Sequence, residues 1–108
     1  MTEFVTAATT DEIPPGERLV VEIDDVWVVI FNVGGQYYAL EDMCTHEEYY
    51  LSEGMIDGYQ IECAKHGARF DVRDGKVMAP PAVIPVKWYQ IRIVNNEIQV
   101  SRAGIRQK

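Results

Sequence analysis

The sequence predicts an all-β protein built from antiparallel sheets, arranged as a sandwich or a barrel. Three observations predict this class. The apolar residues fall in many short runs, pairs of glycine, asparagine or aspartate separate those runs, and no window of about 11 residues or more has a helical period. The 108 residues contain no repeat and no linker, so we expect one domain, residues 1–108.

The first predicted strands are long and lie close together. They are Arg18–Ile23, Val26–Val33 and Gln36–Leu40. Asp24-Asp25 and Gly34-Gly35 separate them, and such pairs favour tight hairpin turns because they tolerate positive φ. Val26–Val33 is almost wholly apolar, so we expect this strand to be partly buried on both faces.

The later predicted strands are mostly shorter. They are Met55–Ile56, Gln60–Glu62, Arg69–Asp71, Val86–Val94 and Glu97–Val100, with turns at Asp57-Gly58, Asp74-Gly75, Pro80-Pro81 and Asn95-Asn96. Trp27, Trp88 and Tyr89 lie in apolar strands, and we expect them in the hydrophobic core because aromatic side chains bury the most area.

The chain is acidic, with 17 acidic and 10 basic residues and a formal net charge of −7. This charge argues against a nucleic-acid partner, because binding there depends on neutralising phosphates. No apolar stretch is long enough to span a membrane, and the first residues lack the features of a secretion signal. We therefore expect a cytoplasmic protein with no membrane partner.

All cysteines and histidines of the chain lie in two short motifs. The first is Cys44-Thr45-His46 and the second is Cys63-Ala64-Lys65-His66. Each motif offers one thiolate and one imidazole from a loop at a strand end. Two such loops facing each other would supply the ligands of a Rieske-type [2Fe–2S] cluster, in which two cysteines bind one iron and two histidines bind the other.

Other interpretations of these four residues remain open. Zn²⁺ also binds two cysteines and two histidines, although zinc fingers usually have both cysteines in one motif and both histidines in the other. The two thiols could form a disulfide, which would leave the histidines unexplained. The residues could also be unrelated core side chains, but their grouping into two motifs argues against this.

The sequence resembles the Rieske ferredoxins, the small electron carriers of bacterial ring-hydroxylating oxygenase systems, especially those of biphenyl- and carbazole-type dioxygenases. The matching segments are Cys44-Thr45-His46, Leu51-Ser52-Glu53-Gly54, Ile61–Asp71 and Asp74-Gly75-Lys76-Val77. The resemblance implies a Rieske fold of antiparallel sheets. In this fold a cluster-binding subdomain, about residues 42–76, is inserted into a larger basal β-domain.

The resemblance also implies the roles of the site residues. Cys44 and Cys63 would bind the inner iron of the [2Fe–2S] cluster. His46 and His66 would bind the outer iron, which faces solvent. A loop at Pro80-Pro81 would cover another side of the cluster.

The implied function is one-electron transfer. A ferredoxin of this kind accepts electrons from a flavin-containing NAD(P)H reductase and passes them to a terminal aromatic ring-hydroxylating oxygenase, and both contacts are transient. The chain has no histidine left for a mononuclear iron site and no G-x-G-x-x-G motif, so we expect a carrier without a small-molecule substrate, not an enzyme. The alternatives are a Rieske ferredoxin of a diiron aromatic monooxygenase and a zinc-stabilised β-module with a binding role.

Respiratory-chain Rieske proteins differ from this sequence at four informative positions. Where they have two further cysteines, this chain has Tyr49 and Lys65, so no disulfide would join the two loops. Where they have a serine and a tyrosine that donate hydrogen bonds to the cluster, it has Ala68 and Phe70. Such hydrogen bonds favour the reduced cluster, so their loss predicts a potential of about −150 mV rather than about +300 mV.

Acidic residues lie close in sequence to the ligands. They are Glu47, Glu48, Glu53, Asp57 and Glu62, and Glu48 replaces a glycine that is frequent in the family. One interpretation is a docking rim, because charge around a docking face raises encounter rates. The other interpretation, for Glu47 and Glu48, is an ordinary solvated turn.

Overall fold

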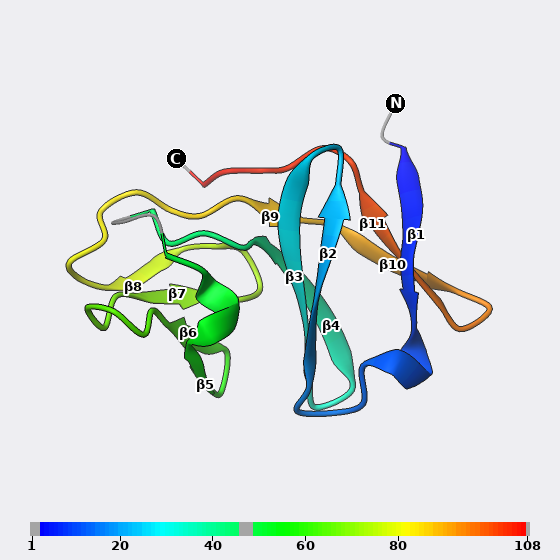
Figure 1. Cartoon of the computed structure of the whole chain (residues 1–108), viewed down its shortest axis with the longest axis horizontal. Helices are drawn as coiled ribbons and strands as arrows, with labels where there is room; N and C mark the ends of the chain where they lie inside the picture. The colour runs from blue at the N-terminus through cyan, green and yellow to red at the C-terminus, as the bar shows by residue number, and fades with distance from the viewer. Residues whose placement is uncertain (1–2, 46–48, 108) are drawn as a thin grey trace.

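The computed structural model describes residues 3–45 and 49–107, which form three antiparallel sheets (Figure 1). The strand orders are β1-β11-β10, β2-β3-β4-β9 and β5-β6-β7-β8. The prediction of an all-β fold of antiparallel sheets is confirmed. Among the described residues, no helix is long and apolar enough to cross a membrane.

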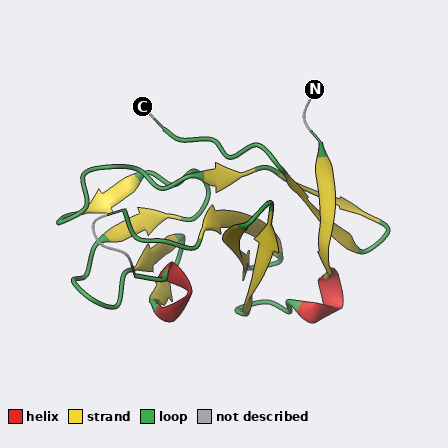
Figure 2. Ribbon diagram, turned by 45° about the horizontal axis from the view of Figure 1, so that its top comes forward, coloured by secondary structure: helices red, strands yellow, loops and turns green. Residues whose placement is uncertain are grey.

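Most strands are short. The first sheet contains β1 (Phe4–Thr9), β10 (Ile91–Val94) and β11 (Glu97–Ser101). The second contains β2 (Arg18–Ile23), β3 (Val26–Val33), β4 (Gln36–Glu41) and β9 (Trp88–Tyr89). The third contains β5 (Met55–Asp57), β6 (Gln60–Glu62), β7 (Arg69–Asp71) and β8 (Val77–Ala79). The described residues also contain two short 3₁₀ helices, η1 (Thr10–Glu12) and η2 (Leu51–Glu53) (Figure 2).

The second sheet lies between two hydrophobic cores, in the middle of the view in Figure 1. Val29 and Phe31 of β3 belong to the core that includes residues of the third sheet. Val28 and Ile30 belong to the core that includes residues of the first sheet. Successive side chains of a strand point to opposite faces, so the apolar run of β3 is buried on both faces, as the sequence predicted.

Two of the hairpin turns are made by non-glycine residues with positive φ. Asp24 and Asp25 have φ values of 50° and 65°, and Asn95 and Asn96 have values of 51° and 67°. Aspartate and asparagine tolerate this backbone better than other side chains, and two such residues in succession match the twist of a hairpin. These pairs close the β2–β3 and β10–β11 hairpins at the predicted positions.

The predicted strand Val86–Val94 is in fact two strands in different sheets. β9 pairs with β4, and the chain then crosses to the first sheet, where β10 pairs with β11. At the crossing, the carbonyl of Gln90 accepts a hydrogen bond from the N–H of Ser101 at 2.9 Å. The apolar residues continue across this point, so their pattern does not indicate the change of sheet. β1 and β8 were not predicted, because small residues and short length leave them with weak patterns.

The three aromatic residues expected in the core differ in exposure. Tyr89 is buried, and Trp88 packs partly buried against the core. Trp27 is 50% exposed, so the prediction for this residue is wrong. It lies near the start of β3 opposite Glu22 of β2, and it lines a surface hollow of about 290 Å³ together with Tyr50.

Asp71, at the end of β7, is a buried carboxylate held by Arg73. Arg73 donates its backbone N–H (2.9 Å) and Nε (3.0 Å) to one carboxylate oxygen and a terminal nitrogen (2.8 Å) to the other. The side-chain hydrogen bond from Arg73 is the main cause that lowers the pKa of Asp71, and burial opposes it.

Replacing Arg73 by leucine should therefore lower the melting temperature by a few degrees at neutral pH. Because the pKa of Asp71 is lowered by folding, this stabilisation is present above the usual carboxyl pKa of about 4 and is lost as the pH falls through the lowered value. The difference in melting temperature between the unchanged protein and the variant should be equal at about pH 8 and pH 6. It should shrink only below about pH 4. Thermal unfolding followed by far-UV circular dichroism measures it.

Arg92→Leu is the matched control for this variant. Both arginines lie over an aromatic ring, Arg73 over Tyr59 and Arg92 over Phe4. Arg92 donates to the amide of Gln99 rather than to a carboxylate. The fall in melting temperature caused by Arg92→Leu should therefore not depend on pH. A deficit of Arg73→Leu that grows on acidification would contradict the assignment.

Candidate metal centre

The two cysteines occupy equivalent places in two loops. Cys44 follows β4, and its backbone N–H donates to the carbonyl of Tyr49 at 2.7 Å. Cys63 follows β6, and its N–H donates to the carbonyl of Ala68, also at 2.7 Å. In both loops the backbone N–H of the cysteine thus donates a hydrogen bond to the carbonyl of the fifth residue after it. Each loop is closed at its base, and its cysteine lies at the point of closure.

Both thiols are buried in the same hydrophobic core. Each cysteine is 2% exposed, and the two are not joined by a disulfide, so the disulfide considered from the sequence is not formed. The core around them includes Leu51, Ile61 and Phe70. Apolar surroundings restrict the access of water to sulfur ligands, which helps to set the properties of a bound metal.

His66 lies on the exposed part of the second loop, although Cys63, three residues earlier, is buried. The next residue, Gly67, has a φ of 78°, and its N–H donates to the carbonyl of Cys63 at 3.0 Å. This left-handed glycine closes a turn that leaves the thiol inside and the imidazole outside. His46 of the first motif lies outside the described residues.

The connection 80–87, between β8 and β9, packs against the first loop. Ala82 is buried in the same core as the two cysteines. The hydroxyl of Thr45, inside the first motif, donates a hydrogen bond to the carbonyl of Ile84. The loop that the resemblance places over the cluster therefore lies against the first motif, and its Pro80–Pro81 peptide is cis.

Asp42 and Arg18, to which no motif in the sequence assigns a role, hold the first loop in place through the segment 52–54. The carboxylate of Asp42 accepts hydrogen bonds from the N–H (2.7 Å) and the hydroxyl (2.8 Å) of Ser52. Arg18 of β2 donates to the carbonyls of Ser52 (3.1 Å) and Gly54 (2.7 Å). Buried polar groups require such partners. Here the bonds to Asp42 join the two ends of the loop, and those from Arg18 fasten its second end to the second sheet. Arg18 and Asp42 come from segments outside the motifs, so the sequence does not indicate that they bond to Ser52 and Gly54.

Ala68 and Phe70 are fully buried in the core that contains Cys63. Neither side chain carries a hydrogen-bond donor. These two positions therefore add no side-chain donor beside the second cysteine.

Part of the acidic rim predicted from the sequence is neutralised. Arg69 forms ion pairs with Glu62 at 2.9 Å and with Asp57 at 3.5 Å. Glu53 is exposed on η2, whereas Glu47 and Glu48 lie outside the described residues.

The donor set fits a Rieske [2Fe–2S] cluster. Two buried thiols at loop closures suit an inner iron, and an exposed imidazole suits an outer iron near the surface. Within residues 3–45 and 49–107, no three cysteine, histidine, aspartate or glutamate side chains gather as a site for a metal ion.

Comparisons with known proteins agree with this fit. The model of the Rieske [2Fe–2S] domain matches residues 3–90. The biphenyl dioxygenase ferredoxin subunit of Pseudomonas sp. strain KKS102 is 48% identical over 105 residues, which cover 94% of this chain and 96% of that protein.

Two solved structures are also similar over most of their length. The ferredoxin of carbazole 1,9a-dioxygenase from Nocardioides aromaticivorans IC177 is 36% identical with a TM-score of 0.86, covering 90% of this chain and 95% of that one. A chain in a complex of reduced oxygenase and oxidized ferredoxin in carbazole 1,9a-dioxygenase is 30% identical with a TM-score of 0.89, covering 96% and 97%.

Proposed function

The chain belongs to the Rieske [2Fe–2S] domain family, and we propose that it is the ferredoxin component of an aromatic ring-hydroxylating dioxygenase system. In this role it is an electron carrier and not the catalytic enzyme. One observation carries the proposal: two buried thiols close two equivalent loops, and the second loop exposes a histidine. Similarity to the biphenyl dioxygenase ferredoxin subunit over 94% of the chain supports it.

When bound, a Rieske [2Fe–2S] cluster supplies one-electron chemistry. We assign Cys44 and Cys63 to its inner iron and His46 and His66 to its outer iron. The core around the thiols restricts water, and the exposed His66 places one ligand where a partner protein can approach. We assign the cluster-binding subdomain to about residues 42–76, which include both loops.

The partners of this role are a flavin-containing NAD(P)H reductase as the electron donor and a terminal oxygenase as the acceptor. The complex of oxygenase and ferredoxin described for the carbazole system supports the second partner. Contacts between redox partners are typically small and transient. A cytoplasmic location suits this role, because a reducing compartment keeps cysteine ligands as thiols.

Reconstitution tests the proposed function. The holoprotein is combined with NADH, a flavin reductase and the oxygenase component of the biphenyl dioxygenase of strain KKS102. Formation of the dihydroxylated product should depend on the added protein, and the reduced protein should show a rhombic electron paramagnetic resonance signal. A colourless zinc protein, or a coloured protein that supports no turnover, would refute the proposal.

The midpoint potential should lie at the low end of the Rieske range, about −150 mV. Ala68 and Phe70 add no hydrogen-bond donor, so the more negative, reduced state gains no stabilisation from their side chains. Protein-film voltammetry measures the potential. A midpoint well above 0 mV would overturn this prediction without affecting the assignment of the cluster.

A further inference from the structure

The charges are divided unevenly along the chain. Only four of the 17 acidic residues lie after position 57: Glu62, Asp71, Asp74 and Glu97. Only one of the 10 basic residues, Arg18, lies before that position. The first cysteine loop therefore belongs to an acidic half of the chain, and the second belongs to a basic half. Because the two loops meet at one end of the molecule, this end combines both charges.

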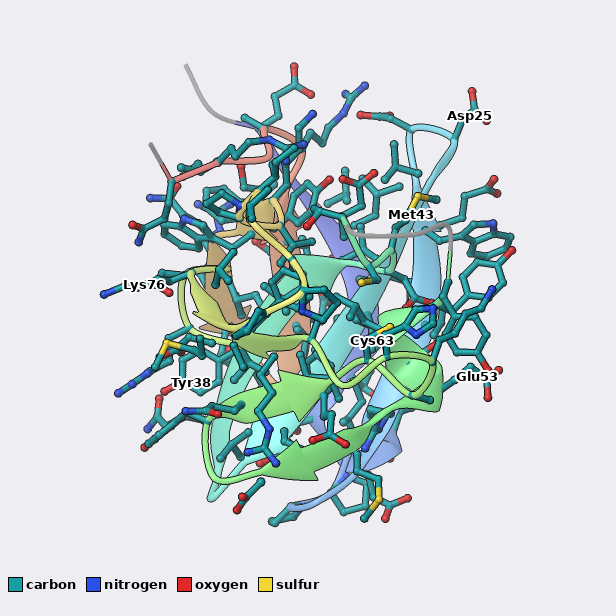
Figure 3. The ribbon with its side chains drawn as sticks, turned by 90° about the vertical axis from the view of Figure 1, so that its left-hand side faces the viewer. Asp25, Tyr38, Met43, Glu53, Cys63 and Lys76 are labelled. Carbon is teal, nitrogen blue, oxygen red and sulfur yellow. The ribbon has the colours of Figure 1, made fainter. Side chains whose placement is uncertain are left out.

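Figure 3 looks onto this end of the molecule, with Cys63 near the centre of the view. Glu53 of η2 and Asp25 of the β2–β3 turn lie on the right of the view, and Lys76 lies on the left. All three charged residues are exposed. In the part of the chain that the structure describes, neither Glu53 nor Lys76 forms an ion pair, so both charges face solvent.

Further cations gather on the side of Lys76. The N–H of Val86 donates to the carbonyl of Gly75 at 3.0 Å, which joins the turn before β8 to the connection 80–87. The guanidinium of Arg106 donates to the carbonyl of Pro85, in the same connection, at 2.7 Å. We call the three exposed cations beside this connection the basic flank: Lys76, Lys87 and Arg106.

The opposite side combines acidic and apolar side chains. Trp27, Met43 and Tyr50 are 50%, 39% and 50% exposed, and Trp27 and Tyr50 line the same hollow. Exposed apolar side chains that lie together, unlike isolated ones, are typical of interaction sites on proteins. We call the exposed acidic residues on this side the acidic flank: Glu22, Asp25 and Glu53.

We propose that this polarity orients the terminal oxygenase on the ferredoxin. A basic, partly apolar surface of the oxygenase faces the acidic flank, and an acidic surface faces the basic flank. Opposite charges speed the encounter, and like charges reject the reversed orientation. The division of charge across this end, rather than the net charge of −7, then sets the rate of productive docking. This inference rests on the proposed function and specifies how its acceptor binds.

A double charge exchange, Glu53→Lys with Lys76→Glu, tests the orientation because it reverses the polarity and leaves the net charge unchanged. Ferredoxin reduced by dithionite is mixed in a stopped-flow instrument with the oxygenase component of the biphenyl dioxygenase of strain KKS102. The second-order rate constant at low salt should fall at least ~10-fold, the lower end of electrostatic steering effects. At about 1 M salt the difference should disappear, because screening then acts within about 3 Å.

A second exchange, Arg92→Glu with Glu97→Lys, is the matched control. These exposed residues lie on the β10–β11 hairpin, at the far end from the third sheet (Figure 1), and the exchange also preserves the net charge. Its rate constant should equal that of the unchanged protein. Visible absorbance and circular dichroism show that both variants are folded and loaded.

The results distinguish a failure of the proposed orientation from a failure of the proposed function. An unchanged rate constant for the first exchange, or an equal fall for the control, overturns the orientation. Dithionite reduces the ferredoxin without the reductase. If the first exchange slows electron transfer only when the reductase supplies the electrons, the charges orient the reductase instead, and the proposed orientation of the oxygenase is also overturned. If the unchanged protein does not reduce the oxygenase at any salt concentration, the proposed function itself fails.

Discussion

Replacing Cys63 by serine should give a colourless protein that binds almost no iron. The thiol is 2% exposed at the closure of its loop, and Cys44, itself assigned as a ligand, is the only other cysteine, so no further thiol can replace it. A serine hydroxyl stays protonated at neutral pH and is a much poorer ligand for a cluster that prefers thiolate. Iron and acid-labile sulfide per protein, together with visible absorbance, measure the loss.

The His66→Cys variant provides the comparison for this result. It preserves a metal-binding side chain at the exposed position, so iron should be retained while the Rieske resonance signal changes. Far-UV circular dichroism of both variants reports whether the sheets still form. A Cys63→Ser protein with the iron content and colour of the unchanged protein would contradict the assignment of this ligand.

Gly75→Ala should be among the most damaging changes of a single methyl group. A Cβ at this position would lie 1.9 Å from the carbonyl oxygen of Val86 and 3.0 Å from its carbon, so backbone must move. Gly75 also has a φ of 74°, which side chains rarely adopt. Strain and overpacking together should cost about 3 kcal/mol. The melting temperature should therefore fall by roughly 12 °C or more.

Gly58→Ala separates the two contributions. Gly58 has a similar φ of 60°, but a Cβ there would meet nothing within 4 Å. Gly58→Ala should therefore lose only the stability that the left-handed backbone costs an alanine, about 1 kcal/mol. The melting temperature should fall by roughly 4–8 °C. Thermal unfolding of both variants gives the comparison. Equal losses would show that the approach to Val86 does not matter for stability.

The sequence predicted features that depend on neighbouring residues. Paired aspartates and asparagines mark hairpin turns because their tolerance of positive φ is a local property. The apolar run of β3 predicts burial on both faces for the same reason. The change of sheet at Gln90 and the exposure of Trp27 depend on which strands pack beside these residues in the folded chain. The residues next to them in sequence do not indicate this.

The candidate site also has features that the sequence predicts and features that it cannot predict. The two motifs contain every cysteine and histidine of the chain, so composition and spacing alone predict the ligands. The hydrogen bonds from Ser52 to Asp42 and from Thr45 to Ile84 join segments that folding brings together. The sequence also could not show that Arg69 neutralises part of the predicted acidic rim, because that requires the pairing of β5, β6 and β7.

The sheet order β1-β11-β10 has a consequence for how the chain folds during synthesis. β1 is made first, but its pairing partner β11 is made last, and Phe4 pairs with Ser101. β1 can therefore pair only after β11 has been synthesised. By contrast, the hairpins of the second and third sheets pair strands that are close in sequence, and such local contacts form faster. The region that carries the cysteine loops can thus take shape before the chain ends are joined.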